Sequence, residues 1–327
     1  MILARKSLAI FFCAFLPGSL LADMSSVQGW LDRMSQAGRS LNYEGTFVYQ
    51  HHKKLETMRI VHKVDEYGER ERLMSLEGAA REIIRNNKSV TCILPDDKAV
   101  MVDKSRPKKS FTSAFPDSFE KLAPYYHFSM QGHERVAGLD TRIITIKPKD
   151  KFRYGYRLWL ENETGLLLKS EKLDENAVPI EKIVFTSIRI NKSIEDDDLR
   201  PQTSGREFTW YTEKDKDILM QPKDSPWKVD KLPVGFILKH YNTHDLPDSN
   251  EQIKHIVFTD GLAWISVYIE PLSHSKEFLQ GESHMGAVSA YGRVIGDYHV
   301  TVVGEVPSET ARMMGDSVRF TGTMASK

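Results

Sequence analysis

The sequence predicts a β-rich α+β protein that is exported and divided into two domains. Three observations support this prediction: an apolar leader, a long series of short segments in which apolar and polar residues alternate, and a chain of 327 residues. Alternation with period two is typical of strands with one buried face, and the short spacings leave no room for helices between them. Roughly 300 residues after the leader exceed one typical domain, which favours two.

The first 22 residues have the pattern of a secretory signal. Arg5 and Lys6 give a positive start, residues 7–21 are almost wholly apolar and uncharged, and the small residue Ala22 follows. This order is typical of a leader that is cleaved on export. The apolar run is short for a membrane span, which disfavours an uncleaved anchor. We therefore expect residues 1–22 to be removed.

The remaining chain is nearly neutral and has one cysteine. Without the leader it has 43 Lys and Arg against 45 Asp and Glu, which gives no electrostatic reason to expect a nucleic acid as partner. Cys92 has no second cysteine with which to form an internal disulfide. It lies in an apolar strand pattern without a neighbour that would stabilise a thiolate. This pattern predicts a buried, unreactive thiol.

After the leader the chain is expected to begin with one helix and to continue as a meander. Ser25 and Gln28 have the spacing of a capping box. The apolar positions that follow at helical period are Val27, Trp30, Leu31, Met34 and Leu41. The period then changes to two, and turn residues such as Gly68 and Gly78 separate the segments. The predicted strands are residues 43–50, 58–64, 71–77, 81–85, 90–94 and 99–102.

The second half of this domain is expected to continue the same sheet. A basic segment at residues 104–109 interrupts the meander, a short capped helical turn is expected at 117–120, and a mobile aromatic segment at 125–128 follows. Strands are predicted again at residues 141–146, 153–160, 165–170 and 181–190. Few helices are available to cover the apolar face of the sheet. The sequence therefore predicts a concave apolar groove.

A change of composition near residue 191 suggests a linker, because acidic residues and prolines replace the alternating pattern. Three aromatic residues are expected to dock the linker onto a domain: Phe208, Trp210 and Tyr211. The expected boundaries are 23–204 for the large domain, 205–226 for the linker, 227–320 for the small domain and 321–327 for a flexible tail.

The small domain is expected to contain an antiparallel sheet and a terminal helix. Two hairpins with two-residue turns are predicted, one through Asp260 and Gly261 and one through Gly296 and Asp297. A helix is expected to begin at Pro307. Its buried side is expected to carry Ala311, Met314 and Val318.

The residues that suggest catalysis or metal binding do not form a complete site. Residues 281–286 are similar to a nucleophile elbow, but the second glycine stands one position too far along. His240 and His244 have the spacing of helical metal ligands, whereas Gly235 and Asn242 disfavour a helix there. We expect no catalytic residues, no metal and no cofactor. The residues alone predict an exported binding protein, with a hydrolase as the alternative.

Several longer segments, in order along nearly the whole mature chain, carry a family resemblance. They are residues 134–138 with Thr141, 148–160 and 164–170 in the large domain, and 232–236, 258–262, 285–288, 291–293 and 302–307 in the small domain. In these segments the chain resembles the RseB/MucB family.

The resemblance implies a large domain like those of the lipoprotein carrier LolA and its receptor LolB, which is an unclosed antiparallel barrel with helices across its concave side. It also implies a periplasmic negative regulator that binds the periplasmic region of an anti-sigma factor such as RseA or MucA and protects it from site-1 proteolysis. Lipopolysaccharide or lipoprotein acyl chains would release this partner. A lipid carrier of the LolA type is the alternative, although the second domain argues against it. Formation of a homo-oligomer stays open.

Three groups of residues are candidate contacts. The candidate acyl-chain contacts, which in the alternative reading form a closed core, are Phe47, Tyr49, Met58, Ile60, Tyr125, Tyr126, Phe128 and Tyr156. The candidate headgroup contacts, which in the alternative reading form a solvated loop, are Lys104, Arg106, Lys108 and Lys109. Tyr291 and Arg293 stand near predicted turns of the small domain and suit a protein interface. The linker is expected to let the two domains reorient.

Overall fold

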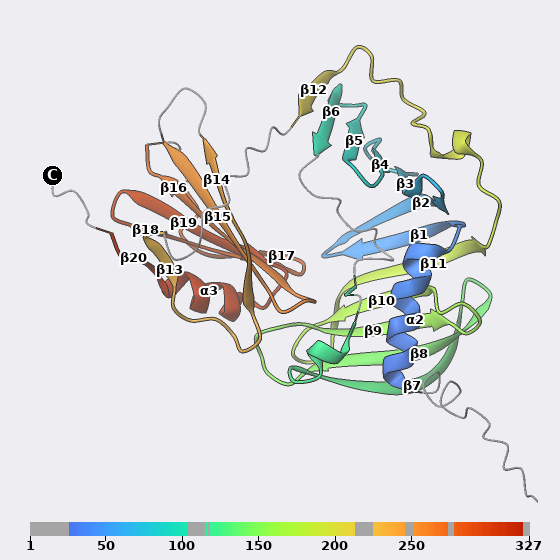
Figure 1. Ribbon diagram of the computed structural model, residues 1–327, viewed down its shortest axis with the longest axis horizontal. Coiled ribbons are helices and arrows are strands. Elements are labelled where there is room, and N and C mark those ends of the chain that lie inside the picture. The colour runs from blue at the N-terminus through green and yellow to red at the C-terminus, as the bar shows by residue number, and fades with distance from the viewer. Residues whose placement is uncertain are drawn as a thin grey trace, which may run out of the picture.

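The computed structural model describes residues 26–103, 115–116, 118–212, 225–245, 251–273 and 278–322, which form two sheet-based domains (Figure 1). The expected leader, the four basic headgroup candidates between residues 104 and 109, and residues 323–327 of the expected tail lie outside this part of the chain. Among the described helices, none combines the length and apolar character needed to cross a membrane.

The large domain is built on one twelve-stranded sheet. Its first strands are β1 (Tyr43–His51), β2 (Lys54–Asp65), β3 (Gly68–Ser75), β4 (Glu82–Arg85), β5 (Val90–Leu94) and β6 (Ala99–Asp103). The others are β7 (Tyr126–Val136), β8 (Leu139–Pro148), β9 (Gly155–Glu161), β10 (Leu167–Leu173), β11 (Pro179–Ile190) and β12 (Thr209–Thr212). The order is β12-β6-β5-β4-β3-β2-β1-β11-β10-β9-β8-β7, so the end strands β12 and β7 do not meet. The sheet is unclosed, as the family resemblance implies.

Helix α2 (Val27–Ser40) lies across this sheet in front of β8 to β11 (Figure 1). It buries Trp30, Leu31 and Met34, as the apolar period predicts. The capping residue is Ser26 instead of Ser25, because its side chain accepts a hydrogen bond of 2.9 Å from the amide of Gly29. The expected position of the cap was therefore one residue too early.

Two strands of the large sheet were not predicted. Strand β7 includes most of the aromatic segment 125–128, which is paired along its length with β8 and is not a free loop. Strand β12 adds to the edge of the sheet in parallel with β6, so part of the expected linker extends the large sheet. Trp210 and Tyr211 stay more than half exposed there, which shows that backbone pairing attaches this segment.

Three short features complete the large domain. The expected helical turn near residue 118 lies slightly later, as the 3₁₀ turn η1 (Glu120–Leu122). A second such turn, η2 (Asp196–Leu199), has a capping box in which the Glu195 side chain takes part. Cys92 lies in β5 as expected, but it is only partly buried.

The small domain has a six-stranded sheet covered on one side by α3 (Ser308–Asp316). Its strands are β14 (Ile237–Asp245), β15 (Gln252–Thr259), β16 (Trp264–Pro271), β17 (Gly281–Met285), β18 (Val288–Ile295) and β19 (Tyr298–Gly304), in the order β14-β15-β16-β19-β18-β17. A separate pair consists of β13 (Trp227–Val229) and β20 (Val318–Phe320). The turn through Gly296 and Asp297 has two residues, as predicted, because Ile295 pairs with Tyr298.

The first hairpin of this domain differs from the prediction. Thr259 pairs with Trp264, so the turn between β15 and β16 has four residues, 260–263, where two were expected. The Oδ1 atom of Asp260 accepts hydrogen bonds from the amides of Leu262, at 2.9 Å, and Ala263, at 2.7 Å. An aspartate that bonds backbone amides two and three residues ahead stabilises a wider turn than the type that Asp-Gly usually forms.

Candidate functional site

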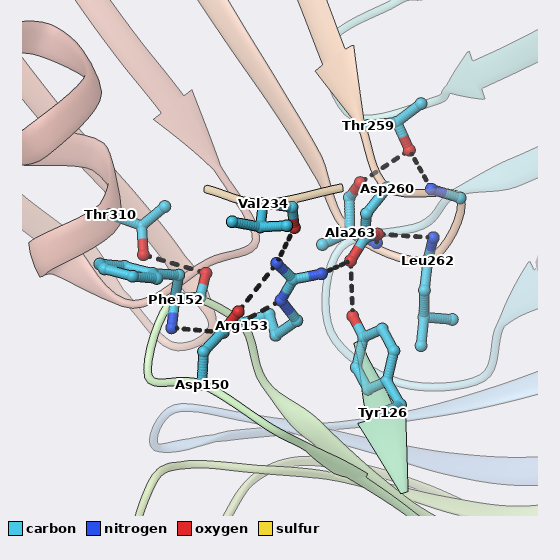
Figure 2. A network of polar contacts seen from close by, with 11 residues as sticks. Tyr126, Asp150, Phe152, Arg153, Val234, Thr259, Asp260, Leu262, Ala263 and Thr310 are labelled. Atoms are coloured by element: carbon cyan, nitrogen blue, oxygen red, sulfur yellow. Dashed lines mark hydrogen bonds and ion pairs between the residues drawn. The ribbon is translucent and has the colours of Figure 1, made fainter. Parts of the chain in front are cut away.

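A buried ion pair joins the two domains (Figure 2). Arg153 precedes β9 in the large domain, and Asp260 begins the β15–β16 turn in the small domain. The Nη1 atom of Arg153 lies 2.6 Å from Oδ2 of Asp260, and neither side chain is exposed to solvent. A buried charge is strongly destabilising unless it is paired and hydrogen-bonded. This pair therefore requires the two domains to stay in contact.

The other donors and acceptors around the pair come from both domains. Arg153 donates through Nε to Asp150 at 3.1 Å and through Nη2 to the carbonyl oxygen of Val234 at 2.7 Å. The hydroxyl of Tyr126 donates to Oδ2 of Asp260 at 2.8 Å. We call Tyr126, Asp150, Arg153, Val234 and Asp260 the domain junction; Figure 2 shows how they converge.

Aromatic rings surround the guanidinium of Arg153. It lies 5.3 Å from the ring centre of Tyr125, 5.5 Å from that of Tyr126 and 5.1 Å from that of Phe236. Burial works against the charged form, but Asp260, Tyr126 and Asp150 together outweigh it and hold the pKa of Arg153 above its ordinary value. Burial and the charge of Asp260 also raise the pKa of the Tyr126 hydroxyl, which therefore stays a neutral donor.

Further contacts between the domains surround the junction. The hydroxyl of Thr310, in α3, donates to the carbonyl of Phe152 at 3.0 Å. Lys151 and Glu309 form an ion pair of 2.6 Å in which both side chains are exposed. Gly235 lies so close to Tyr125 that a Cβ atom there would be 2.4 Å from the ring. The sequence predicts that the linker lets the two domains reorient. Any such reorientation has to break the buried contacts of the domain junction.

A cavity of about 290 Å³ lies beside these contacts, between the two domains. Its walls in the large domain are Phe115, Tyr156, Ser170, Lys172, Glu181 and Ile183, and its walls in the small domain are Leu262, Trp264 and Glu305. We call it the junction cavity. One part of the wall is aromatic and aliphatic, and the other part holds three charged side chains. Such a mixture suits a ligand with an apolar body and one polar end.

The charged part of the junction cavity is built around Lys172. Its Nζ atom lies 2.6 Å from a carboxylate oxygen of Glu181, on β11, and 2.6 Å from one of Glu305, in the small domain. The hydroxyl of Tyr49 donates to the other oxygen of Glu181. Burial alone would raise the pKa of Glu181, but Lys172 and the two hydrogen bonds outweigh it and lower that pKa.

The lowered pKa of Glu181 predicts a pH dependence of stability. Its stabilising effect is fully present above the ordinary value of 4.5 and is lost as the pH falls through the lower folded-state pKa. We expect Glu181→Gln to lower the free energy of unfolding by about 1–3 kcal/mol at neutral pH. This difference should shrink below about pH 4.5 in denaturant titrations at stepped pH. Asp197→Asn, at an exposed pair, is the control, and an equal shrinkage there would contradict the assignment.

The candidate acyl-chain residues lie in three places. Phe47, Met58 and Ile60 are buried in a closed core with Tyr43, Phe185 and Ala37 of α2, which corresponds to the alternative considered above. Tyr125 and Tyr126 contact Arg153 at the domain junction, and Phe128 packs beside Phe119 of the core. Tyr156 lines the junction cavity, and Tyr49 bonds to Glu181 in its wall. The structure does not place these eight residues along one groove.

The candidate partner contacts are held in place by α3. The hydroxyl of Tyr291 donates to the carboxylate of Asp316 at 2.7 Å, and Arg293 donates to the carbonyl of the same residue at 3.1 Å. Both side chains are half-buried. Residues 281–286 form the edge strand β17 and its turn, so they have no elbow geometry. Among the described residues, no group of three or more His, Cys, Asp or Glu could hold a metal ion.

Neither Arg153 nor Asp260 was predicted from the sequence as a site residue, and Tyr126 was predicted only as an acyl-chain contact. Arg153 and Asp260 are 107 positions apart, and each was part of a segment that carried the family resemblance. The only local signal was a charge beside an apolar strand pattern. Lys172 and Glu305 also stand beside apolar strand patterns. Charged residues in such positions are usually exposed to water, so the sequence did not predict that Lys172 would be buried.

Family models match both domains in order. The MucB/RseB N-terminal domain matches residues 26–203, and the MucB/RseB C-terminal domain matches residues 221–319. The relative "Sigma factor AlgU regulatory protein MucB" of Pseudomonas aeruginosa is 32% identical over 309 residues, which cover 93% of each chain. "Sigma-E factor regulatory protein RseB" of Haemophilus influenzae is 29% identical over 327 residues, which cover 96% of this chain and 99% of the relative.

Solved structures of MucB are similar to this chain over both domains. The Pseudomonas aeruginosa MucA/MucB complex gives a TM-score of 0.70 at 29% identity, with 91% of this chain and 99% of the solved chain covered. A crystal structure of MucB with MucA(peri) also gives 0.70, at 28% identity and with 91% and 100% covered. A crystal structure of MucB alone gives 0.62, at 30% identity and with 92% and 98% covered.

Proposed function

Since this chain belongs to the MucB/RseB family, we propose that it binds the periplasmic part of a membrane-bound anti-sigma factor and so regulates a sigma factor. The observation that carries the proposal is the similarity, over both domains, to MucB solved in complex with MucA. A partner with a periplasmic segment places the chain in the periplasm, which agrees with the secretory pattern of its leader. Binding of this kind needs no catalytic residue.

The arrangement of the domains supports a binding surface that uses both of them. The two MucB structures with MucA score higher than MucB alone, which favours an arrangement of the partner-bound kind. The domain junction can hold this arrangement before the partner arrives, and a preorganised surface loses less entropy on binding. Tyr291 and Arg293 remain our proposed contacts in the small domain, because Asp316 holds both side chains in place.

We further propose how the bound partner is regulated. The bound chain shields the anti-sigma segment from site-1 proteolysis, and an outer-membrane lipid releases it. We place the acyl chain of that lipid in the junction cavity, beside Tyr156 and Leu262. Burial of each methylene contributes about 0.8 kcal/mol, so a few methylene groups suffice for weak, reversible binding. The proposal excludes Phe47, Met58 and Ile60 from the contact, because they are buried in the core.

The partner is tested by a pulldown and a cleavage assay. With the mature chain as bait in an envelope extract, we expect one inner-membrane anti-sigma factor to be retained. Addition of the chain should then slow cleavage of the purified periplasmic segment by the site-1 protease. The mature large domain alone, as bait at equal density, controls for contacts that need only one domain. Retention of no anti-sigma factor, together with unchanged cleavage, would contradict the proposal.

A further inference from the structure

Lys172 is a buried cation with two unequal carboxylate partners. Its side chain is 8% exposed, and its ammonium lies in the wall of the junction cavity. Burial works against the charge, but Tyr156, Glu305 and Glu181 outweigh it and hold the pKa of Lys172 above its ordinary value. The ammonium therefore stays charged and must keep anionic partners, because an unpaired buried charge is strongly destabilising.

The two carboxylates differ in how firmly they are held. Glu181 belongs to the same sheet as Lys172, is 17% exposed and also accepts a hydrogen bond from Tyr49. Glu305 comes from the small domain and is 56% exposed, and Lys172 is its one ion-pair partner among the described residues. Glu305 can therefore leave Lys172 and be solvated by water, whereas Glu181 cannot do so without leaving its own buried bonds.

We propose that the junction cavity binds the anionic end of a single-chain amphiphile by an exchange at Lys172, in which the ligand's phosphate or carboxylate replaces Glu305. The exchange keeps the local charge constant, since one anion leaves the ammonium and one arrives. The apolar wall formed by Phe115, Tyr156 and Leu262 receives the chain. A volume of about 290 Å³ suits one short stretch of hydrocarbon.

The exchange would also change the contact between the domains. Glu305 is the small domain's contribution to the Lys172 cluster, so its release removes one ion pair across the junction. A ligand that binds more tightly when this pair is open must favour the open arrangement, as linkage requires. This inference rests on the proposed function, because it supplies a route by which an amphiphile lowers the affinity for the anti-sigma segment.

The test compares three probes on the full mature chain by calorimetry, below their micelle concentrations. They are dodecyl phosphate, neutral dodecyl maltoside with the same chain, and inorganic phosphate without a chain. A charge-assisted bond at Lys172 predicts at least about tenfold tighter binding of dodecyl phosphate than of the maltoside. Inorganic phosphate should not compete at equal concentration. Binding of phosphate as tight as that of dodecyl phosphate would point to a free anion and overturn the proposal.

Two variants connect the preference to the exchange. Lys172→Met should abolish the preference for dodecyl phosphate, whereas Lys151→Met, at an exposed pair across the same interface, should leave it unchanged. Glu305→Gln keeps nearly the same side-chain shape and removes only the charge that competes for Lys172. It should therefore tighten dodecyl phosphate binding about threefold. A preference that survives Lys172→Met, or weaker binding with Glu305→Gln, would overturn the exchange.

The last arm separates this inference from the proposed function. The anti-sigma segment is titrated into the same proteins with and without dodecyl phosphate. If the segment binds neither the wild-type chain nor any variant, the proposed function fails. The amphiphile titrations still decide whether the exchange at Lys172 occurs. If the segment binds and dodecyl phosphate leaves its affinity unchanged, the coupling between the two is wrong. We expect dodecyl phosphate to weaken segment binding to the wild-type chain at least about threefold.

Discussion

Replacement of Asp260 by Ala is expected to lower the free energy of unfolding by about 3–5 kcal/mol, because it leaves the buried guanidinium of Arg153 without its main partner. Tyr126 and the amides of Leu262 and Ala263 lose their acceptor as well. The pair joins two domains, so we also expect the wild-type chain to unfold in one thermal transition in scanning calorimetry and Asp260→Ala to unfold in two.

Two further variants test the origin of this effect. Asp260→Asn keeps an acceptor for the turn amides and should lower stability less than Asp260→Ala. Glu309→Gln removes the exposed ion pair with Lys151 across the same interface and should change stability by at most about 1 kcal/mol. If Asp260→Ala and Glu309→Gln have equal small effects, the buried pair does not hold the domains together.

Replacement of Gly235 by Ala is expected to lower the free energy of unfolding by about 2–5 kcal/mol in denaturant titrations. The residue has φ of +93°, where an L side chain is strained by about 1–2 kcal/mol. The new Cβ would also lie 2.4 Å from the ring of Tyr125, which belongs to the other domain. Steric overlap of this kind adds about 1–3 kcal/mol and pushes the two domains apart.

A matched glycine separates the backbone strain from the overlap. Gly138 has φ of +83° and no atom within 4 Å of a new Cβ, so Gly138→Ala should show only the strain. The double variant Gly235→Ala with Tyr125→Ala relieves the overlap and should recover part of the loss. If Gly235→Ala and Gly138→Ala have the same effect on stability and on segment binding, the ring of Tyr125 does not lock the interface.

The strand pattern of the large domain could be predicted wherever one face is buried. The alternation in β1 and β2 places Phe47 opposite Met58 in the core, and the sequence shows this as period two. Strand β7 is buried only at its two end residues, Tyr126 and Val136. Its middle is largely exposed, contains Gly132 at φ of +134° and shows no alternation of this kind. Its pairing with β8 is therefore visible only in the assembled sheet.

The candidate site depends on contacts between residues that are distant in the sequence. Aromatic and apolar residues such as Phe47 and Tyr156 have the same local pattern, although one is in a closed core and the other lines a cavity between domains. The Asp-Gly pair at residue 260 is typical of a tight hairpin, but Asp260 also bonds to Arg153 and Tyr126 of the other domain. A contact between residues so far apart in the sequence cannot be predicted from the local pattern around either of them.

We expect partner binding to need both domains in the arrangement held by the domain junction. The direct test titrates the anti-sigma periplasmic segment into the full mature chain, the large domain alone and the small domain alone, with circular dichroism to check that each is folded. We predict at least about tenfold weaker binding to either domain than to the full chain, because two linked surfaces act at high effective concentration. If the large domain alone binds the segment as tightly as the full chain, the two-domain account is wrong.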